Sequence, residues 1–309
     1  MTAKQIQETL FQKYYLNDQL SEVTSSPWSE FGRKTTVKQS GDGFDFNASG
    51  ISAFARKKIP VINTLKHYPI DFLLHQLLKK HHGHPETIQA AKLITQKLKI
   101  HFDFDHAKHV LIYDLLNSYG LFNTENLICI IGDGHGFFGT LIKSLRPDEK
   151  ILFINLGKNL LIDTICFSKI FPNIEPLHYH QLENFDQIKN NEIIFLEAEQ
   201  FELLQNLPIC LFINVASMQE MDASIINRYF EYMRTSSAEP HFYCCNREEK
   251  TLPDGEVSRF ADYPWATGRR GVDILLDELC PWYQKYPNWR PPFWRPFDGP
   301  IMQRLEKLK

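Results

Sequence analysis

The sequence has no long apolar run, no excess of positive charge and no paired-cysteine motif. Its 34 Lys and Arg residues stand against 37 Asp and Glu residues, a formal net charge of −3. This balance argues against the basic face that a nucleic-acid-binding protein needs. No apolar segment is long enough to cross a bilayer, and the N-terminus lacks the basic and then apolar pattern of a signal peptide. The six Cys residues are scattered without a C-x-x-C, which is typical of buried thiols in a reducing compartment. We therefore expect a cytoplasmic protein with no nucleic-acid partner and no membrane span.

Apolar and aromatic residues are abundant. The hydrophobic set makes up 43% of the 309 residues and the aromatic residues 13%, enough for a chain that is folded around a large core. Three of the five Trp residues lie between Trp282 and Trp294, in a stretch rich in proline. We expect this segment to wrap over the core as extended chain. It either stacks on sugar rings through residues such as Trp289 and Trp294 or simply covers a sheet edge.

Residues 1–122 are predicted to form a helical N-terminal cap or substrate region. Apolar residues recur at helical spacing at 6–15 and at 70–78. Pro85 opens a further helix, and Asp105 is expected to cap another that ends at Gly120. The segment from Ser21 to Ser52 is rich in Ser, Thr, Gly and Asp, and is predicted to be a long loop.

From residue 127 onward, short apolar segments alternate with helical patterns. The predicted strands are LICIIG (127–132), KILFINL (150–156), EIIFLEA (192–198), ICLFINVAS (209–217) and HFYCCN (241–246). Strands that are apolar throughout and alternate with helices indicate a parallel sheet covered on both faces. We therefore predict an α/β fold, with a doubly wound Rossmann-like sheet in residues 123–309. VDILLDEL (272–279) is predicted to be one more helix.

A glycine-rich turn, I-I-G-D-G-H-G-F-F-G from Ile130 to Gly139, directly follows the first of these strands. Its glycines allow the backbone to turn sharply and approach a ligand closely, and the amides of the next helix suit a polar or anionic group. The spacing fits a dinucleotide or S-adenosylmethionine (SAM), and it also fits a turn without a ligand. A dinucleotide site usually has an acid about 20 residues further on, whereas the second strand ends at Asn155.

Several motifs together resemble the sugar O-methyltransferase family of the class I SAM-dependent methyltransferases. The family's E-I-G-G-G-x-G-G turn is similar to the turn described above, and its V-D-L-P segment is similar to Ile154–Gly157. FINVASMQEM (212–221) resembles its N-x-x-S-x-x-E-M stretch, CCNRE (244–248) its N-R, and DGPIMQRLEKL (298–308) its closing D-G-P-x-x-x-R-L. The likeness is strongest over 127–250. It implies a class I methyltransferase fold, SAM as the cofactor and an O-methyltransferase activity on a sugar.

The resemblance also implies a set of cofactor contacts. They are Gly132, Asp133, Gly134, Gly136, Asn155, Glu197, Gln200 and Asn214. Two positions depart from the family pattern, because Ile130 replaces the acid before the first glycine and Asn155 replaces the acid that binds the ribose. Asn155 can still accept one hydrogen bond, and the lost charge weakens that bond by about 1 kcal/mol. These departures leave open a non-catalytic interaction protein with the same fold.

A sugar hydroxyl must lose its proton to become a good nucleophile, so a positioned general base is expected at the carboxyl ends of the strands. Glu220 is our first candidate, with a helix N-terminal acid as its structural alternative. His135, in the turn, is the second candidate catalytic residue, and a surface histidine is its alternative. The candidate substrate contacts are Ser217, Gln219, Asn246 and Arg247, and the last two also suit a surface ion pair.

We expect the acceptor to be a sugar, a sugar nucleotide or another glycan precursor. The rival enzyme class is an NAD-dependent sugar oxidoreductase. The histidines between residues 81 and 109 lack Cys and H-E-x-x-H partners, so no metal site is predicted. The oligomeric state stays open, with a homo-oligomer among the options.

Overall fold

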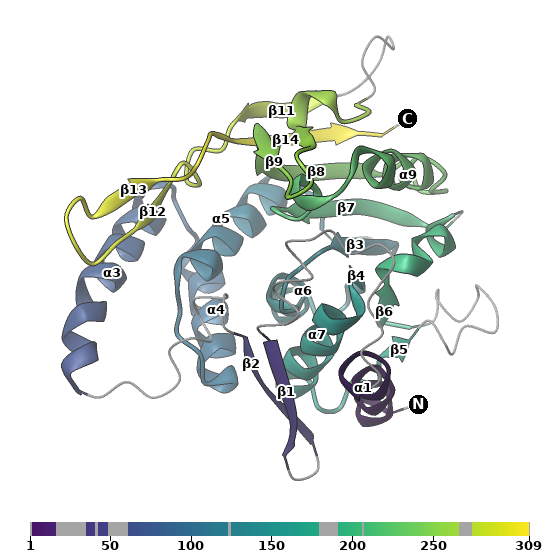
Figure 1. The fold of residues 1–309 in the computed structure, drawn as a ribbon, viewed down its shortest axis with the longest axis horizontal. Helices are drawn as coiled ribbons and strands as arrows, with labels where there is room; N and C mark the ends of the chain where they lie inside the picture. The colour runs from purple at the N-terminus through teal and green to yellow at the C-terminus, as the bar shows by residue number, and fades with distance from the viewer. Residues whose placement is uncertain are drawn as a thin grey trace.

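The computed structural model describes residues 2–16, 35–40, 43–48, 61–122, 125–178, 191–205, 207–265 and 274–308. Its centre is an eight-stranded sheet in the order β11-β14-β8-β7-β3-β4-β6-β5 (Figure 1). The strands are β3 (Leu127–Ile131), β4 (Lys150–Asn155), β5 (Leu177–His178), β6 (Ile193–Glu197), β7 (Ile209–Val215), β8 (His241–Arg247), β11 (Ile274–Leu279) and β14 (Ile301–Lys307).

The sheet is mostly parallel. All neighbours from β5 to β8 pair in parallel, whereas β14 runs antiparallel to both β8 and β11. After β3 the chain adds β4 and β6 on one side and then β7 and β8 on the other, so the topological switch lies between β3 and β7. The predicted α/β class with a doubly wound, Rossmann-like sheet is thereby confirmed.

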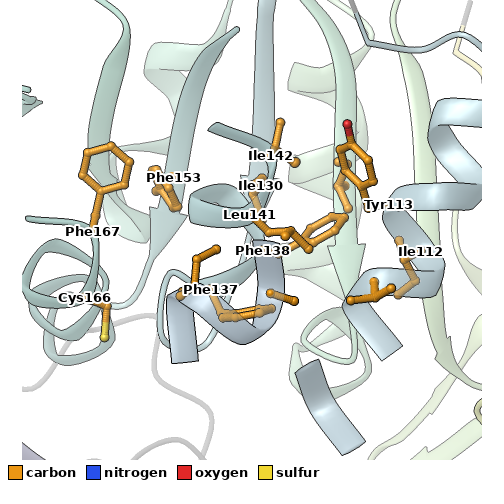
Figure 2. Close-up of a cluster of buried hydrophobic side chains, with 14 of the residues drawn as sticks. Ile112, Tyr113, Ile130, Phe137, Phe138, Leu141, Ile142, Phe153, Cys166 and Phe167 are labelled. Carbon is orange, nitrogen blue, oxygen red and sulfur yellow. The ribbon is translucent and has the colours of Figure 1, made fainter. Parts of the chain in front are cut away.

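Helices cover both faces because side chains alternate along each strand. Ile128 and Ile130 face one core, which they share with α5 (Phe104–Ser118), α6 (Phe137–Leu145) and α7 (Gly157–Ile170). Figure 2 shows this cluster, in which Ile130 lies beside Leu141, Phe138 and Phe153. Cys129 and Ile131 face the other core, against α9 (Ala223–Met233) and the short helix η3 (Ala198–Leu204).

The N-terminal helices pack on the first of these cores. α1 (Ala3–Phe11) continues into a short π-helical turn, η1 (Gln12–Leu16), and lies against α7. α3 (Val61–Lys80) and α4 (Pro85–Leu98) lie beside α5. One prediction changes here. The cap of α5 is Asp103 rather than Asp105, since Oδ1 of Asp103 accepts the backbone N–H of Asp105 at 3.0 Å.

Two segments differ from their predicted secondary structure. Within the predicted loop from Ser21 to Ser52, the described residues form a hairpin of β1 (Thr35–Ser40) and β2 (Gly43–Ala48), which buries Phe44 and Phe46 against the core. The rest of that loop lies outside the described residues.

The predicted helix at 272–279 is strand β11 over its described part, because β14 offers it backbone partners and cross-strand pairs. One such pair is Arg304–Asp277, with Nη1 and Oδ2 3.1 Å apart.

The remaining short elements follow β7 and β8. They are η4 (Met218–Glu220), β9 (Glu249–Thr251), β10 (Val257–Arg259), η5 (Phe260–Asp262), β12 (Lys285–Pro287) and β13 (Trp294–Pro296). The proline-rich segment is extended, as predicted, and includes the β12–β13 hairpin. Within the described part of the chain, no helix is both long and apolar enough to span a membrane.

Candidate functional site

The glycine turn lies at the carboxyl end of β3, beside the topological switch. Gly132, Gly134 and Gly136 have left-handed φ angles of +74°, +83° and +68°. A Cβ atom on Gly132 would lie 2.3 Å from Oγ of Ser217, and one on Gly136 would lie 2.9 Å from Cα of Asp163. At Gly134 such an atom would meet nothing within 4 Å. The turn therefore packs closely against the loop after β7 and against helix α7, whereas no described residue fills the space beside Gly134.

Asp133 occupies the amides that follow this turn. Its Oδ1 accepts the N–H of Phe138 at 2.9 Å, and its Oδ2 accepts the N–H of Gly139 at 2.8 Å. Burial raises the pKa of Asp133 to about 6, although these two bonds act in the opposite direction. The sequence prediction of free amides for an anionic group is thus wrong at these two positions. The chain supplies its own carboxylate there.

Ile130 and Asn155, the two departures from the family pattern, have different surroundings. Ile130 is buried, and its Cδ1 would lie 3.0 Å from a Cβ on Gly139. Nδ2 of Asn155 donates to Oδ2 of Asp163 at 2.9 Å, and its Oδ1 accepts the N–H of Leu156 at 3.0 Å. Asp163 is fully buried, and burial raises the pKa of its carboxyl well above the ordinary value. The amide of Asn155 is therefore the partner of a buried acid.

The loop after β7 is held by a network of side-chain amides. Nδ2 of Asn214 donates to the carbonyl of Ile131 at 2.9 Å, and Nδ2 of Asn246 donates to Oδ1 of Asn214 at 2.8 Å. Gln219 extends the network, because its N–H donates to Oδ1 of Asn246 at 3.1 Å and its Oε1 accepts the N–H of Arg247 at 2.7 Å. These bonds tie together the ends of β3, β7 and β8, so the N-x-x-S-x-x-E-M stretch has a structural role here.

A cavity of about 450 Å³ opens beside the turn. Of the candidate residues, Gly132, Asn155, Ser217 and Glu220 line it. Most of the other lining residues are apolar and come from the ends of β3, β4, η3 and α9: Ile131, Ile154, Leu156, Ala198, Met221, Ile225 and Tyr229. The cavity has the largely apolar wall of a small-molecule site, and it lies where open α/β sheets bind ligands.

Glu220 is the only acid among the described residues that line this cavity. Its Oε1 accepts a hydrogen bond from Nζ of Lys250, and the two side chains are 16% and 20% exposed. The carboxylate is therefore held in place by a cation, and no described residue donates to its Oε2.

Glu197 and Gln200, the predicted adenine contacts, do not line the cavity. Glu197 is fully buried, and its Oε2 accepts hydrogen bonds from the hydroxyl of Tyr14 and from Nζ of Lys13, the latter at 2.7 Å. Gln200 lies within η3 and is half-buried. Ala198, between them, lies at the cavity wall instead.

His135 points away from solvent, into a group of buried rings. Its ring centroid lies 5.6 Å from that of His106 and 6.0 Å from that of Phe137, and His109 stacks on Phe138 at 5.1 Å. Burial, and to a smaller extent the neighbouring His106, lower the pKa of His135 to about 3. Burial also lowers the pKa of His109 well below its ordinary value. His135 is therefore a buried neutral imidazole rather than a surface histidine.

Several residues near the site had no sequence signal. Asp163 lies inside a helical pattern, and Tyr14 is 183 residues from its partner Glu197. Ile225 and Tyr229 are spaced as i and i+4 on α9 and look like ordinary core positions. The i, i+3 pair of His106 and His109 is the one visible pattern, because it places two imidazoles on one face of α5.

Comparisons with solved structures return methyltransferases at low similarity. A SAM-dependent methyltransferase of Aquifex aeolicus has 11% identity and a TM-score of 0.37, covering 64% of this chain and 89% of its own. A glycopeptide N-methyltransferase complexed with sinefungin has 10% identity and a TM-score of 0.35, covering 64% and 92%. A mitomycin 7-O-methyltransferase has 8% identity and a TM-score of 0.38, covering 79% and 68%. At these values, the likeness by itself assigns no function.

No protein-family model and no curated protein matches the chain.

Proposed function

We propose that the chain is a SAM-dependent O-methyltransferase that transfers a methyl group to a hydroxyl of a sugar, a sugar nucleotide or another glycan precursor. The observation that carries the proposal is the cavity at the carboxyl ends of β3, β4 and β7, next to three left-handed glycines. Outward from β3 the sheet continues with β7, β8 and then β14, and β14 is antiparallel to β8. A dinucleotide-binding sheet has a parallel strand there, so the sheet favours SAM over NAD.

The lining residues fit an adenosyl group in part. Leu156, Met221 and Ile225 offer an apolar wall for a flat base. Oδ1 of Asn155 accepts one backbone N–H and retains a lone pair for a ribose hydroxyl. Gly132 keeps the backbone beside the cavity free of a side chain, since a Cβ there would meet Ser217.

When bound, the cofactor would supply a methyl group activated by a sulfonium. The chain's own residues would align the acceptor and remove its proton. In our proposal, Oε2 of Glu220 would take the proton of the acceptor hydroxyl. Lys250 would hold the carboxylate of Glu220 in position through Oε1. Residues 1–122 would then form the cap beside the acceptor.

The test of the cofactor is calorimetric titration with S-adenosylhomocysteine, SAM and NAD. We expect micromolar binding of S-adenosylhomocysteine, weakened at least about tenfold, or ~1.4 kcal/mol, by Ile225→Trp, which fills the cavity. Asn227→Trp is the matched control, because Asn227 lies on the exposed face of the same helix. Binding of NAD alone would favour the oxidoreductase. Binding of none of the three would leave a non-catalytic interaction protein.

The base is tested separately. Glu220→Gln should lower turnover at least ~100-fold and leave the affinity for S-adenosylhomocysteine unchanged. A loss of that affinity would instead show that Glu220 binds the cofactor, and unchanged turnover would remove it from the mechanism. The acceptor for this assay comes from a screen of sugar nucleotides with labelled SAM.

A further inference from the structure

A second cavity, of about 800 Å³, lies between α3 and the segment that joins β11 to β14. This segment stands at the carboxyl edge of the sheet, because Leu279 ends β11 opposite Met302 and Ile301 begins β14 opposite Arg247, the last residue of β8. Figure 1 shows the β12–β13 hairpin lying alongside α3. The second cavity therefore opens at the same edge as the glycine turn, and none of its lining residues is shared with the first cavity.

The lining of this second cavity is cationic. Lys80 and His81 come from the end of α3, and Lys285 comes from β12. No carboxylate is among the described lining residues, and neither lysine has an ion pair within the described chain. Two ammonium groups that share one cavity without an acid create a positive potential there, which favours a bound anion.

The same cavity has an aromatic wall. Trp282 is buried, and the ring of His81 meets it edge-on with centroids 5.8 Å apart. Trp294, from β13, is half-buried and offers part of its ring. Gln284 fixes the segment behind this wall, because its Nε2 donates to the carbonyls of Cys280 at 2.9 Å and Ile301 at 2.6 Å. The wall is thus held by the fold before any ligand arrives.

Cations together with a partly open indole match one class of ligand. We propose that this second cavity binds a phosphorylated carbohydrate, with the phosphate between Lys80 and Lys285 and the CH face of the sugar ring on Trp294. A phosphate accepts charge-assisted hydrogen bonds from ammonium groups. The CH face of a pyranose is apolar and lies well on an aromatic ring.

The second cavity is connected to the glycine turn through α5. The hydroxyl of Tyr283 lies 3.3 Å from Nζ of Lys108 on that helix. His106, on the same helix, packs against His135 of the turn. A ligand anchored by its phosphate in the second cavity would thus lie next to the segment that contacts α5, the helix that packs against the glycine turn. The assignment of this ligand as the acceptor rests on the proposed function, whereas its binding does not.

The test is calorimetric titration without SAM, using glucose 1-phosphate, uridine diphosphate and glucose as probes. We expect both phosphorylated probes to bind, glucose 1-phosphate more tightly, and glucose to bind at least tenfold more weakly. The double variant Lys80→Ala/Lys285→Ala should weaken glucose 1-phosphate at least tenfold, whereas Lys79→Ala, one residue away and outside the lining, should not. Trp294→Ala should weaken it more than Trp289→Ala, because Trp289 does not line the cavity.

Three results would overturn the proposal: no binding of either phosphorylated probe, equal binding of glucose, or an equal loss in Lys79→Ala. The uridine diphosphate arm distinguishes a nucleotide from a sugar phosphate as the source of the phosphate. Titration of the Lys80→Ala/Lys285→Ala variant with S-adenosylhomocysteine keeps the two proposals apart. If glucose 1-phosphate binds and S-adenosylhomocysteine does not, the second cavity stands and the methyltransferase assignment fails.

Discussion

The hydrogen bond between Asn155 and Asp163 gives a sharp test of the site's electrostatics. In Asn155→Asp, a carboxylate oxygen replaces the amide nitrogen that lies 2.9 Å from Oδ2 of Asp163. Two carboxylates at this distance cannot both ionise in a buried site. Burial already raises the pKa of Asp163 well above its ordinary value. A second buried carboxyl opposite it raises the pKa of the pair further, so we expect the folded variant to hold more protons than the wild type between pH 5 and pH 7.5.

The size of the effect follows from linkage. An Asp in the unfolded chain titrates near pH 3.9. A folded pKa raised above this value gives the variant stability at low pH that it loses as the pH rises. If one extra proton is held over the whole range from pH 5 to pH 7.5, the loss is 2.5 pH units at about 1.4 kcal/mol each, or at most about 3.5 kcal/mol. We expect this loss as a difference between Asn155→Asp and the wild type in urea unfolding at the two pH values.

The exchanged double variant, Asn155→Asp/Asp163→Asn, is the control. It restores one amide opposite one carboxylate, so most of the pH-dependent loss should disappear. It also places a carboxylate at the end of β4, and by the proposed function it should bind S-adenosylhomocysteine more tightly than the wild type. If Asn155→Asp is as stable as the wild type at both pH values, Asn155 does not face an ionisable Asp163 and the reasoning fails.

Three further outcomes follow from the site. Gly136→Ala should lower the free energy of urea unfolding by about 2–4 kcal/mol, because the new Cβ adds a clash with the backbone of α7 to the left-handed strain. Gly134→Ala has the strain alone and should lower it by about 1–2 kcal/mol. Equal losses would contradict the close approach of α7. His109→Leu should flatten the acid dependence of stability. A histidine kept neutral by burial makes the folded protein less stable as the pH falls below about 6.5, by about 2 kcal/mol at pH 5. If the variant's stability depends on pH as the wild type's does, burial of His109 is not the cause. Tyr14→Phe should lower the free energy of unfolding by about 1–3 kcal/mol, because the fully buried Glu197 loses a hydrogen-bond donor. An unchanged temperature of thermal unfolding would refute this contact.

The central strands could be predicted from sequence because they are buried on both faces. Cys129 and Ile130 face opposite cores, so β3 is apolar at every position. The edge elements lack this signal. β11 is largely exposed, and the spacing of its apolar residues is typical of a helix. It forms a strand because β14 supplies backbone partners. β14 even buries Glu306, whose Oε2 lies 2.6 Å from Nη2 of Arg304. A buried charge that is neutralised by an ion pair cannot be recognised from the sequence before its partner is known.

The position of the glycine turn was predictable in the same way, since glycines between a strand and a helix leave a local pattern. The partners of its neighbours were not. Glu197 is bound by Lys13 and Tyr14, more than 180 residues away in sequence. Asn214 and Asn246 are 32 residues apart and meet only because β7 and β8 are neighbours. Their residue types suggest ligand contacts, but these side chains are already hydrogen-bonded within the protein.

The acids near the turn show why a missing motif residue does not mean a missing charge. The resemblance places acids at positions 130 and 155, which are Ile and Asn here. Acids stand instead at Asp133, which binds two amides of α6, and at Asp163, which binds the amide of Asn155. Both are buried and bonded within the protein, so neither offers a free carboxylate to the cavity. Among the described lining residues, Glu220 is the one acid, and recognition of a hydroxyl by a carboxylate in this cavity therefore depends on Glu220.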